Sequence, residues 1–137
     1  MTIPPTRKTL LRDGAEGRAA HDVGGLDLGS IDRHDHDPAL WEKRVDAMLI
    51  LLVTKKDVFS IDAMRRVIED YGQQEYDRTT YYEKWIRAIR NLVVEQEVLS
   101  PGEIDRRMAE VAARHRAAGR EVASDSIDWP AAEGAAR

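Results

Sequence analysis

The chain has 137 residues, a formal net charge of −4, and 34% charged and 42% hydrophobic residues, which indicates one modest, helix-rich globular domain. Basic residues are interleaved with acidic ones, so the one-sign surface that nucleic-acid binding requires is not expected. The absence of cysteine excludes disulfides and thiolate metal ligands, and no apolar run approaches the roughly 20 residues of a membrane span.

The first part of the chain predicts an extended arm. Residues 1–37 contain prolines, glycines and alternating charges without a sustained hydrophobic period. So long an irregular segment is rarely kept unless another surface orders it, and we expect the arm to wrap a partner subunit. Within it, His21–Gly25 has the paired glycines of a turn. The N-terminus lacks the apolar core of a signal peptide, which predicts a cytoplasmic protein.

An all-α domain is expected over residues 38–118, with about four helices. The first is predicted from Pro38 to about Lys55, with Asp37 as its N-cap and an apolar stripe broad enough for burial on more than one side. The second is predicted from Ile61 to about Tyr71 after a Ser60 cap. The expected inner positions are Leu40, Trp41, Val45, Met48, Leu49, Leu52, Val53, Ile61, Met64, Val67 and Ile68.

Two further helices follow a polar loop over residues 73–79. Thr80 and Glu83 have the spacing of a capping box, which predicts a third helix running to about Glu97. Ser100 and Glu103 repeat that spacing, and the fourth helix should fade near residue 119, where an irregular tail over 119–137 begins. The expected inner positions are Tyr81, Trp85, Ile89, Leu92, Val93, Ile104, Met108, Val111 and Ala112.

Few residues have the spacing of a catalytic or metal site. His34 and His36 alternate with aspartates, but no third ligand is fixed by spacing, so a solvated loop is the better interpretation. His115 belongs to the outer part of the fourth helix and is interpreted as a surface residue. No Ser-His-Asp arrangement, glycine-rich phosphate loop or HExxH helix is present. By itself, the chain does not look like a self-sufficient enzyme.

Two pairs of side chains are more informative. Arg65 precedes Glu69 by one helical turn, so a simple intrahelical ion pair is one explanation; the other is that an arginine of the pair Arg65-Arg66 offers its planar fork of donors to an anion on a partner. Tyr81 and Tyr82 are also open to two interpretations. They are either core aromatics or residues whose hydroxyl groups face a site or interface.

The order of several short motifs resembles the N-terminal half of the nitrile hydratase beta subunit. The motifs are HDVGG in the arm, WEK at a helix start, FSIDAMRRVIE, and TTYYEKWIRAIRNLVVEQEVLSPGEIDRR. They cover about residues 20 to 108, and the ordered set is more specific than any single motif. A full beta subunit continues into a small barrel. The chain is therefore similar to the split form of the family, as in toyocamycin nitrile hydratase or thiocyanate hydrolase, whose barrel is a separate polypeptide.

The resemblance implies partners and a cofactor. It implies a metal-binding alpha-type subunit, a separate barrel-type subunit carrying the C-terminal part of beta, and a small nitrile substrate, with no nucleic acid or membrane. Non-corrin cobalt(III) or iron(III) would be held by partly oxidised cysteines of the alpha-type subunit, and this chain would bind no cofactor or metal itself.

Site residues are also implied by the resemblance. Arg65 matches an arginine that hydrogen-bonds the oxidised cysteine ligands of the partner, and Glu69 matches the acid one turn later. Tyr81 and Tyr82 match a catalytic tyrosine pair, while Met64, Tyr81 and Trp85 are expected in the substrate pocket. Thr80 replaces a usual proline, and Lys84 replaces a histidine found in some members.

The function implied is that of a small beta-type subunit, not catalytic alone, in a multisubunit nitrile hydratase, which is a lyase. It would close over the metal centre of the alpha-type subunit while a nitrile is hydrated to an amide. Two alternatives stay open: the beta subunit of thiocyanate hydrolase, and a nitrile hydratase activator that acts like a metallochaperone. Equal stoichiometry with the metal-bearing chain would distinguish a subunit from an activator.

Overall fold

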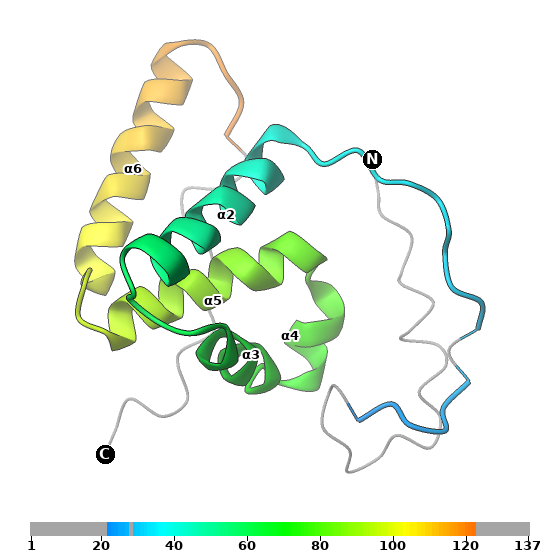
Figure 1. The fold of residues 1–137 in the computed structure, drawn as a ribbon. Helices are drawn as coiled ribbons and strands as arrows, with labels where there is room; N and C mark the ends of the chain where they lie inside the picture. Colours follow the sequence, from blue (N-terminus) through cyan, green and yellow to red (C-terminus); the bar gives the residue numbers. More distant parts are fainter. Residues whose placement is uncertain (1–21, 28, 123–137) are drawn as a thin grey trace. The chain divides into compact units, whose positions relative to one another are not determined.

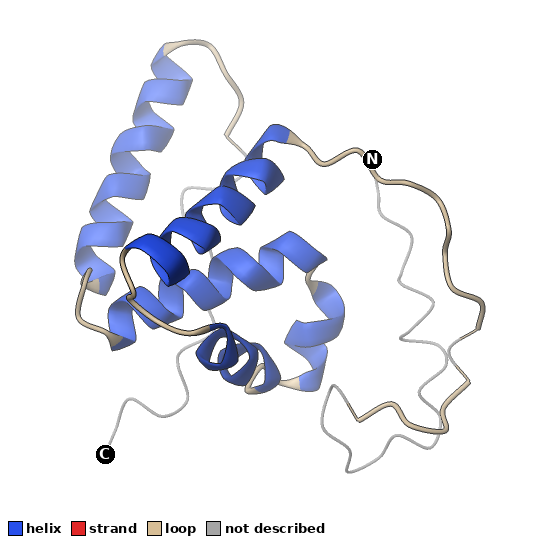
Figure 2. Cartoon of the chain, viewed as in Figure 1, coloured by secondary structure: helices blue, strands red, loops and turns tan. Residues whose placement is uncertain are grey.

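The computed structural model describes residues 22–27 and 29–122, and these residues form helices connected by loops and turns (Figures 1 and 2). No β-strand occurs within these ranges, which confirms the all-α prediction for the part of the chain described. The chain divides into two compact units, residues 1–89 and 90–137. The division falls inside one helix, and each unit is considered by itself.

The first helix, α2, spans Leu40–Ile50 and begins two residues later than its sequence predicts. Its N-cap is Ala39, in extended backbone, rather than Asp37. The Glu42 carboxylate explains the shift, because its Oε2 accepts the amide hydrogen of Ala39 at 2.7 Å and so satisfies a donor at the helix start. Glu42 itself is buried, with 9% of its surface exposed.

A wider turn, η1, continues α2 over Leu51–Lys55 with π-helical hydrogen bonding. The amide of Lys56 donates to the carbonyl of Leu51 at 3.0 Å, and the Thr54 hydroxyl donates back to the Ile50 carbonyl at 2.7 Å. Asp57 then adopts a left-handed conformation, with φ of 49°, and ends the segment. Hydrophobic periodicity alone does not distinguish this turn from an α-helix.

Helix α3 spans Ile61–Glu69 and confirms the predicted cap, because the Ser60 hydroxyl accepts from the Ala63 amide at 3.1 Å. The following segment was expected to be a polar loop, and that expectation is wrong. Gln73–Arg78 forms a short helix, α4. Its sequence, QQEYDR, has no apolar periodicity from which a helix could be predicted.

Helices α5, Tyr81–Glu95, and α6, Pro101–Ala117, match their predicted positions closely. At the start of α5 only half of the expected capping box forms. Glu83 accepts from the Thr80 amide at 2.8 Å, whereas the buried Thr80 hydroxyl has no hydrogen-bond partner. At the start of α6 both halves form between Ser100 and Glu103.

Replacing Ser100 by alanine is expected to lower the free energy of unfolding by about 1 kcal/mol, because an amide of the first turn of α6 loses its acceptor. Chemical denaturation of the full chain measures this loss. Ser100→Thr keeps the acceptor oxygen and should retain most of the stability. Equal losses in the two variants would show that the cap does not stabilise the fold.

The hydrophobic core of the first unit contains fewer than half of the predicted inner positions, together with Phe59, Tyr71 and Ala88, which were not predicted. Its buried side chains are Val45, Leu49, Phe59, Met64, Val67, Ile68, Tyr71, Ala88 and Ile89. In the second unit Leu92, Val93 and Ala112 are buried. Several positions predicted to be internal are instead exposed: Leu40, Trp41, Met48, Ile61 and Tyr81. Within this chain, burial of α2 on more than one side is therefore wrong.

The described part of the arm agrees with its prediction, since residues 22–27 and 29–38 contain no helix or strand. The expected turn is present: the Leu26 amide donates to the Val23 carbonyl at 3.1 Å, and Gly25 has a φ of 75°. Residues 1–21, which include His21, residue 28 and residues 123–137 lie outside the described ranges. The proposed partner contacts of the arm and the extent of the tail stay predictions.

Candidate functional site

Helix α3 presents its arginines to solvent. The Arg65 side chain is 71% exposed, and its Nη1 lies 3.4 Å from Oδ1 of Asp62, one turn earlier. Arg66 is half-exposed and lies 4.0 Å from Asp70. Glu69 is also exposed. A surface ion pair of this length is weak, so the Arg65 guanidinium can exchange Asp62 for a stronger acceptor at little cost.

Four aromatic side chains form one cluster, which we call the aromatic cluster: Trp41 from α2 and Tyr81, Tyr82 and Trp85 from α5. Tyr82 contacts Trp41 edge-on, with ring centroids 6.4 Å apart, and Trp85 at 5.5 Å. Tyr81 lies 5.2 Å from Tyr82 and 4.7 Å from Trp85. These separations are those of favourable aromatic pairs. The structure thus brings together the three predicted site residues of α5, Tyr81, Tyr82 and Trp85.

The members of the aromatic cluster differ in exposure. Tyr81 is 62% exposed, whereas Tyr82 and Trp85 are half-buried. Partial burial, and then the proximity of Tyr82 and Asp46, raise the pKa of the Tyr81 phenol, which keeps it a neutral hydrogen-bond donor. Trp41 was not recognised from sequence as a neighbour of these rings, because its contacts cross about forty residues of chain.

Met64 is placed differently from the other expected site residues. Its side chain is only 3% exposed and belongs to the buried face of α3, with Val67 and Ile68. Arg65, the next residue, points out of that same helix. Met64 therefore supports the helix that carries Arg65, and its assignment to a substrate pocket stays a prediction.

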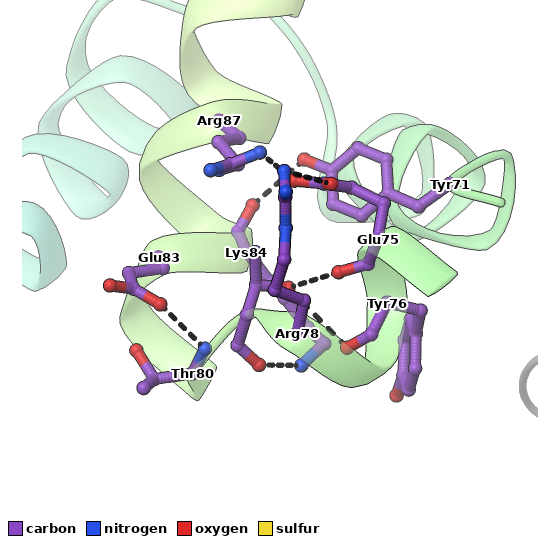
Figure 3. A network of polar contacts seen from close by, with 9 residues as sticks. Tyr71, Glu75, Tyr76, Arg78, Thr80, Glu83, Lys84 and Arg87 are labelled. Atoms are coloured by element: carbon purple, nitrogen blue, oxygen red, sulfur yellow. Dashed lines mark hydrogen bonds and ion pairs between the residues drawn. The ribbon is translucent and has the colours of Figure 1, made fainter. Parts of the chain in front are cut away.

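A network of polar contacts joins α4 to the first turns of α5 (Figure 3). The guanidinium groups of Arg78 and Arg87 both converge on the Glu75 carboxylate. Arg78 lies 2.6 Å from Oε2, and Arg87 forms an ion pair with Oε1. Glu75 and Arg87 are largely buried, with 14% and 15% of their side-chain surfaces exposed, whereas Arg78 is exposed. We call Glu75 and Arg87 the buried ion pair.

Lys84 and Tyr71 complete this network. The Lys84 ammonium donates to the Thr79 carbonyl and lies 4.4 Å from the centre of the Tyr76 ring. The Tyr71 hydroxyl donates to the Lys84 carbonyl at 2.9 Å. Burial raises the pKa of the Tyr71 phenol, an effect that the charge of Arg87 opposes, so the hydroxyl stays protonated and can donate. The Lys84 side chain thus contacts the connection between α4 and α5.

No metal site is apparent in residues 22–27 and 29–122, where no group of three or more histidine, aspartate or glutamate side chains could hold an ion. His34 Nδ1 lies 2.7 Å from Asp32, and His36 Nε2 lies 3.0 Å from Glu42. Both histidines are exposed. None of the helices within those ranges has the length and apolar character needed to cross a bilayer.

The Glu42 carboxylate predicts a pH dependence. Hydrogen bonds from His36 and then from the Ala39 amide hold the pKa of Glu42 below its ordinary value of 4.5. A carboxylate with a lowered pKa stabilises the fold above its ordinary pKa, and this contribution is lost as pH falls through the folded pKa. Glu42→Gln should therefore shrink the loss of Tm between about pH 6 and about pH 3. Identical losses in both proteins would contradict this role.

These observations define a class of protein: a small helical module that exposes Arg65 and Tyr81 at its surface. The family model for the nitrile hydratase beta subunit, N-terminal, matches residues 18–131. The chain belongs to this family.

Comparisons with individual relatives support the same family. The chain is 36% identical over 88 residues to nitrile hydratase subunit beta of Pseudomonas putida, covering 61% of this chain and 40% of that protein. It is 26% identical over 110 residues to thiocyanate hydrolase subunit beta of Thiobacillus thioparus, covering 80% and 70%. A solved structure of the apo-enzyme of thiocyanate hydrolase from Thiobacillus thioparus is similar, with a TM-score of 0.67, 26% identity and coverage of 90% of this chain and 80% of that one.

Proposed function

We propose that this chain is the beta-type subunit of a multisubunit nitrile hydratase and closes over the metal centre of an alpha-type subunit while a nitrile is hydrated to an amide. Membership of the family supports the subunit role. The observation that carries the proposal further is the exposed Arg65 guanidinium on the capped helix α3, whose ion pair among the described residues is a weak contact with Asp62.

The metal would belong to the partner. This chain has no cysteine, and its described residues contain no cluster that could hold an ion. Cobalt(III) or iron(III) held by oxidised cysteines would supply Lewis acidity. The contribution of this chain would be Arg65, whose planar fork can donate two charge-assisted hydrogen bonds to anionic sulfur oxygens as they become desolvated at the interface. Glu69, one turn later on the same helix, would help to orient Arg65.

The aromatic cluster would form the part of the substrate pocket that this chain contributes. Tyr81 is the member with the most exposed ring edge, and its neutral phenol can donate a hydrogen bond. Tyr82 and Trp85 stand behind it and fix its orientation by ring contacts of 5.2 Å and 4.7 Å. A small nitrile would then contact an apolar surface that carries one hydrogen-bond donor, the Tyr81 hydroxyl.

A second candidate is the beta subunit of a thiocyanate hydrolase. It is favoured by the extent of the match, which covers 80% of this chain in sequence and 90% in structure. The same arginine and aromatic surface would then face a partner that hydrolyses thiocyanate. The nitrile hydratase relative shares a higher identity over a shorter region, 36% over 88 residues, and supports the first candidate.

Co-expression of this chain with a cysteine-containing alpha-type chain and a barrel-type chain, sought among the neighbouring genes, tests the proposal. We expect a stable complex with equal amounts of this chain and the metal-bearing chain, and amide formation from a nitrile. Thiocyanate hydrolysis without nitrile hydration would select the second candidate. If this chain increases metal loading but does not co-purify with the enzyme, it is an activator, and the subunit proposal is wrong.

A further inference from the structure

We propose that the buried ion pair, Glu75 with Arg87, is a positioning device that sets the orientation of the aromatic cluster on α5. Its consequence for substrate binding rests on the proposed function, whereas its consequence for ring orientation does not. Both residues would act through the helix, since Arg87 and the rings project from different sides of α5.

Both partners of this pair are largely shielded from water, unlike the two partners of the exposed ion pair in α6. Removing one charge of a buried pair leaves the other desolvated and unpaired. In α6, by contrast, Arg107 and Glu110 lie one helical turn apart in sequence and 2.7 Å apart in space, but their side chains are 67% and 49% exposed. Water can replace either partner there.

The pair also joins two helices, α4 and α5, across a distance in sequence. Glu75 and Arg87 are twelve residues apart, and α4 is a helix of six residues in which no side chain is fully buried, Glu75 itself keeping 14% of its side-chain surface exposed. So short a helix is not stable alone. The buried ion pair, supported by the Lys84 contact with the Thr79 carbonyl, therefore holds α4 against α5 and fixes the turn from which Tyr81 begins the helix.

Helix geometry connects this turn to the rings. Successive residues of an α-helix are rotated by about 100°. Tyr81, Tyr82 and Trp85 consequently share one side of α5, and Arg87 projects from nearly the opposite side. A rotation or translation of α5 against α4 would move all three rings together. Because the Tyr71 hydroxyl holds the Lys84 carbonyl on the side of Arg87, α5 is fastened at two points in successive turns.

Near-ultraviolet circular dichroism of the full chain tests the device without using activity, because the signal depends on the fixed mutual orientation of aromatic rings. Trp129→Phe is introduced first, so that Trp41 and Trp85 are the tryptophans observed. Glu75→Gln should then lose most of this signal while far-ultraviolet circular dichroism, which reports helix content, is largely retained. Glu110→Gln, in the exposed pair, should change neither spectrum.

Two further variants test the proposal in case Glu75→Gln also lowers the helix content. Arg87→Lys keeps the charge but not the planar fork, and an intermediate near-ultraviolet signal with full helix content supports the device. Combining Glu75→Arg with Arg87→Glu restores opposite charges and should recover part of the signal. Unchanged near-ultraviolet spectra in both Glu75→Gln and Arg87→Lys would overturn the proposal.

Kinetics of the co-expressed complex then separate this inference from the proposed function. If the aromatic cluster contacts substrate, Glu75→Gln should raise KM or lower kcat by roughly 10- to 100-fold, and Arg87→Lys should recover part of it. Loss of the near-ultraviolet signal with unchanged kinetics would support the positioning device and refute the assignment of these rings to the substrate pocket.

Discussion

Arg65→Lys is expected to lower turnover of the assembled enzyme by roughly 10²- to 10³-fold, the usual effect of removing an aligned donor from an active site. Lysine keeps the charge but cannot offer two parallel donors in one plane. The folded chain should be almost unaffected, within about 0.5 kcal/mol, since Arg65 is exposed and pairs only weakly with Asp62. Steady-state kinetics and thermal unfolding measure the two effects.

Arg66→Lys is the matched control, because it makes the same substitution on the same helix at a residue that is half-exposed. Its turnover should stay within about twofold of the parent. Metal analysis of each complex shows whether a loss of activity reflects an empty metal centre. Full activity in the Arg65→Lys complex would remove Arg65 from the proposed role, and equal losses in both variants would indicate a general effect of α3 on assembly.

Leu92→Ala should be the most destabilising truncation of an apolar side chain. Leu92 has no exposed surface, and it is the largest side chain of the described residues that is completely enclosed. Removing three carbon atoms loses their transfer free energy and leaves a cavity that helix α5 cannot easily collapse. The expected cost is about 2–5 kcal/mol, measured by chemical denaturation of the full chain.

Leu99→Ala makes the identical change at a residue that is 42% exposed and should cost much less, within about 1 kcal/mol. The comparison separates cavity formation from a general loss of hydrophobicity. Similar costs for the two variants would mean that Leu92 is not enclosed in solution.

Helix positions followed well from sequence wherever local signals agreed. Ser60 and Ser100 each start a helix at the predicted residue, because a hydroxyl acceptor and an apolar period coincide there. Helix α4 was missed, since what stabilises it is remote: the Glu75 carboxylate meets Arg87, twelve residues later. The start of α2 was displaced because Glu42 satisfies the Ala39 amide, a local arrangement that competes with Asp37 and Pro38 as a cap.

The individual residues of the candidate site could be predicted from sequence, but the contacts between residues far apart in the chain could not. The exposure of Arg65 follows from the polar side of an amphipathic α3, and the grouping of Tyr81 and Trp85 follows from their spacing of one turn. The contact of Trp41 with Tyr82 required the fold. Thr80, found where the family usually has proline, uses its amide to bind Glu83, which a proline could not do.

The π-helical turn at Leu51–Lys55 affects how residue numbers are matched between this chain and its relatives. Such a turn accommodates one residue more than an α-helix of the same height, and everything after it is rotated accordingly. A lineage could gain or lose a single amino acid there while keeping Val45 and Leu49 in place. For a relative that lacks the extra residue, an alignment that crosses this point without a gap would match Arg65 to the wrong position.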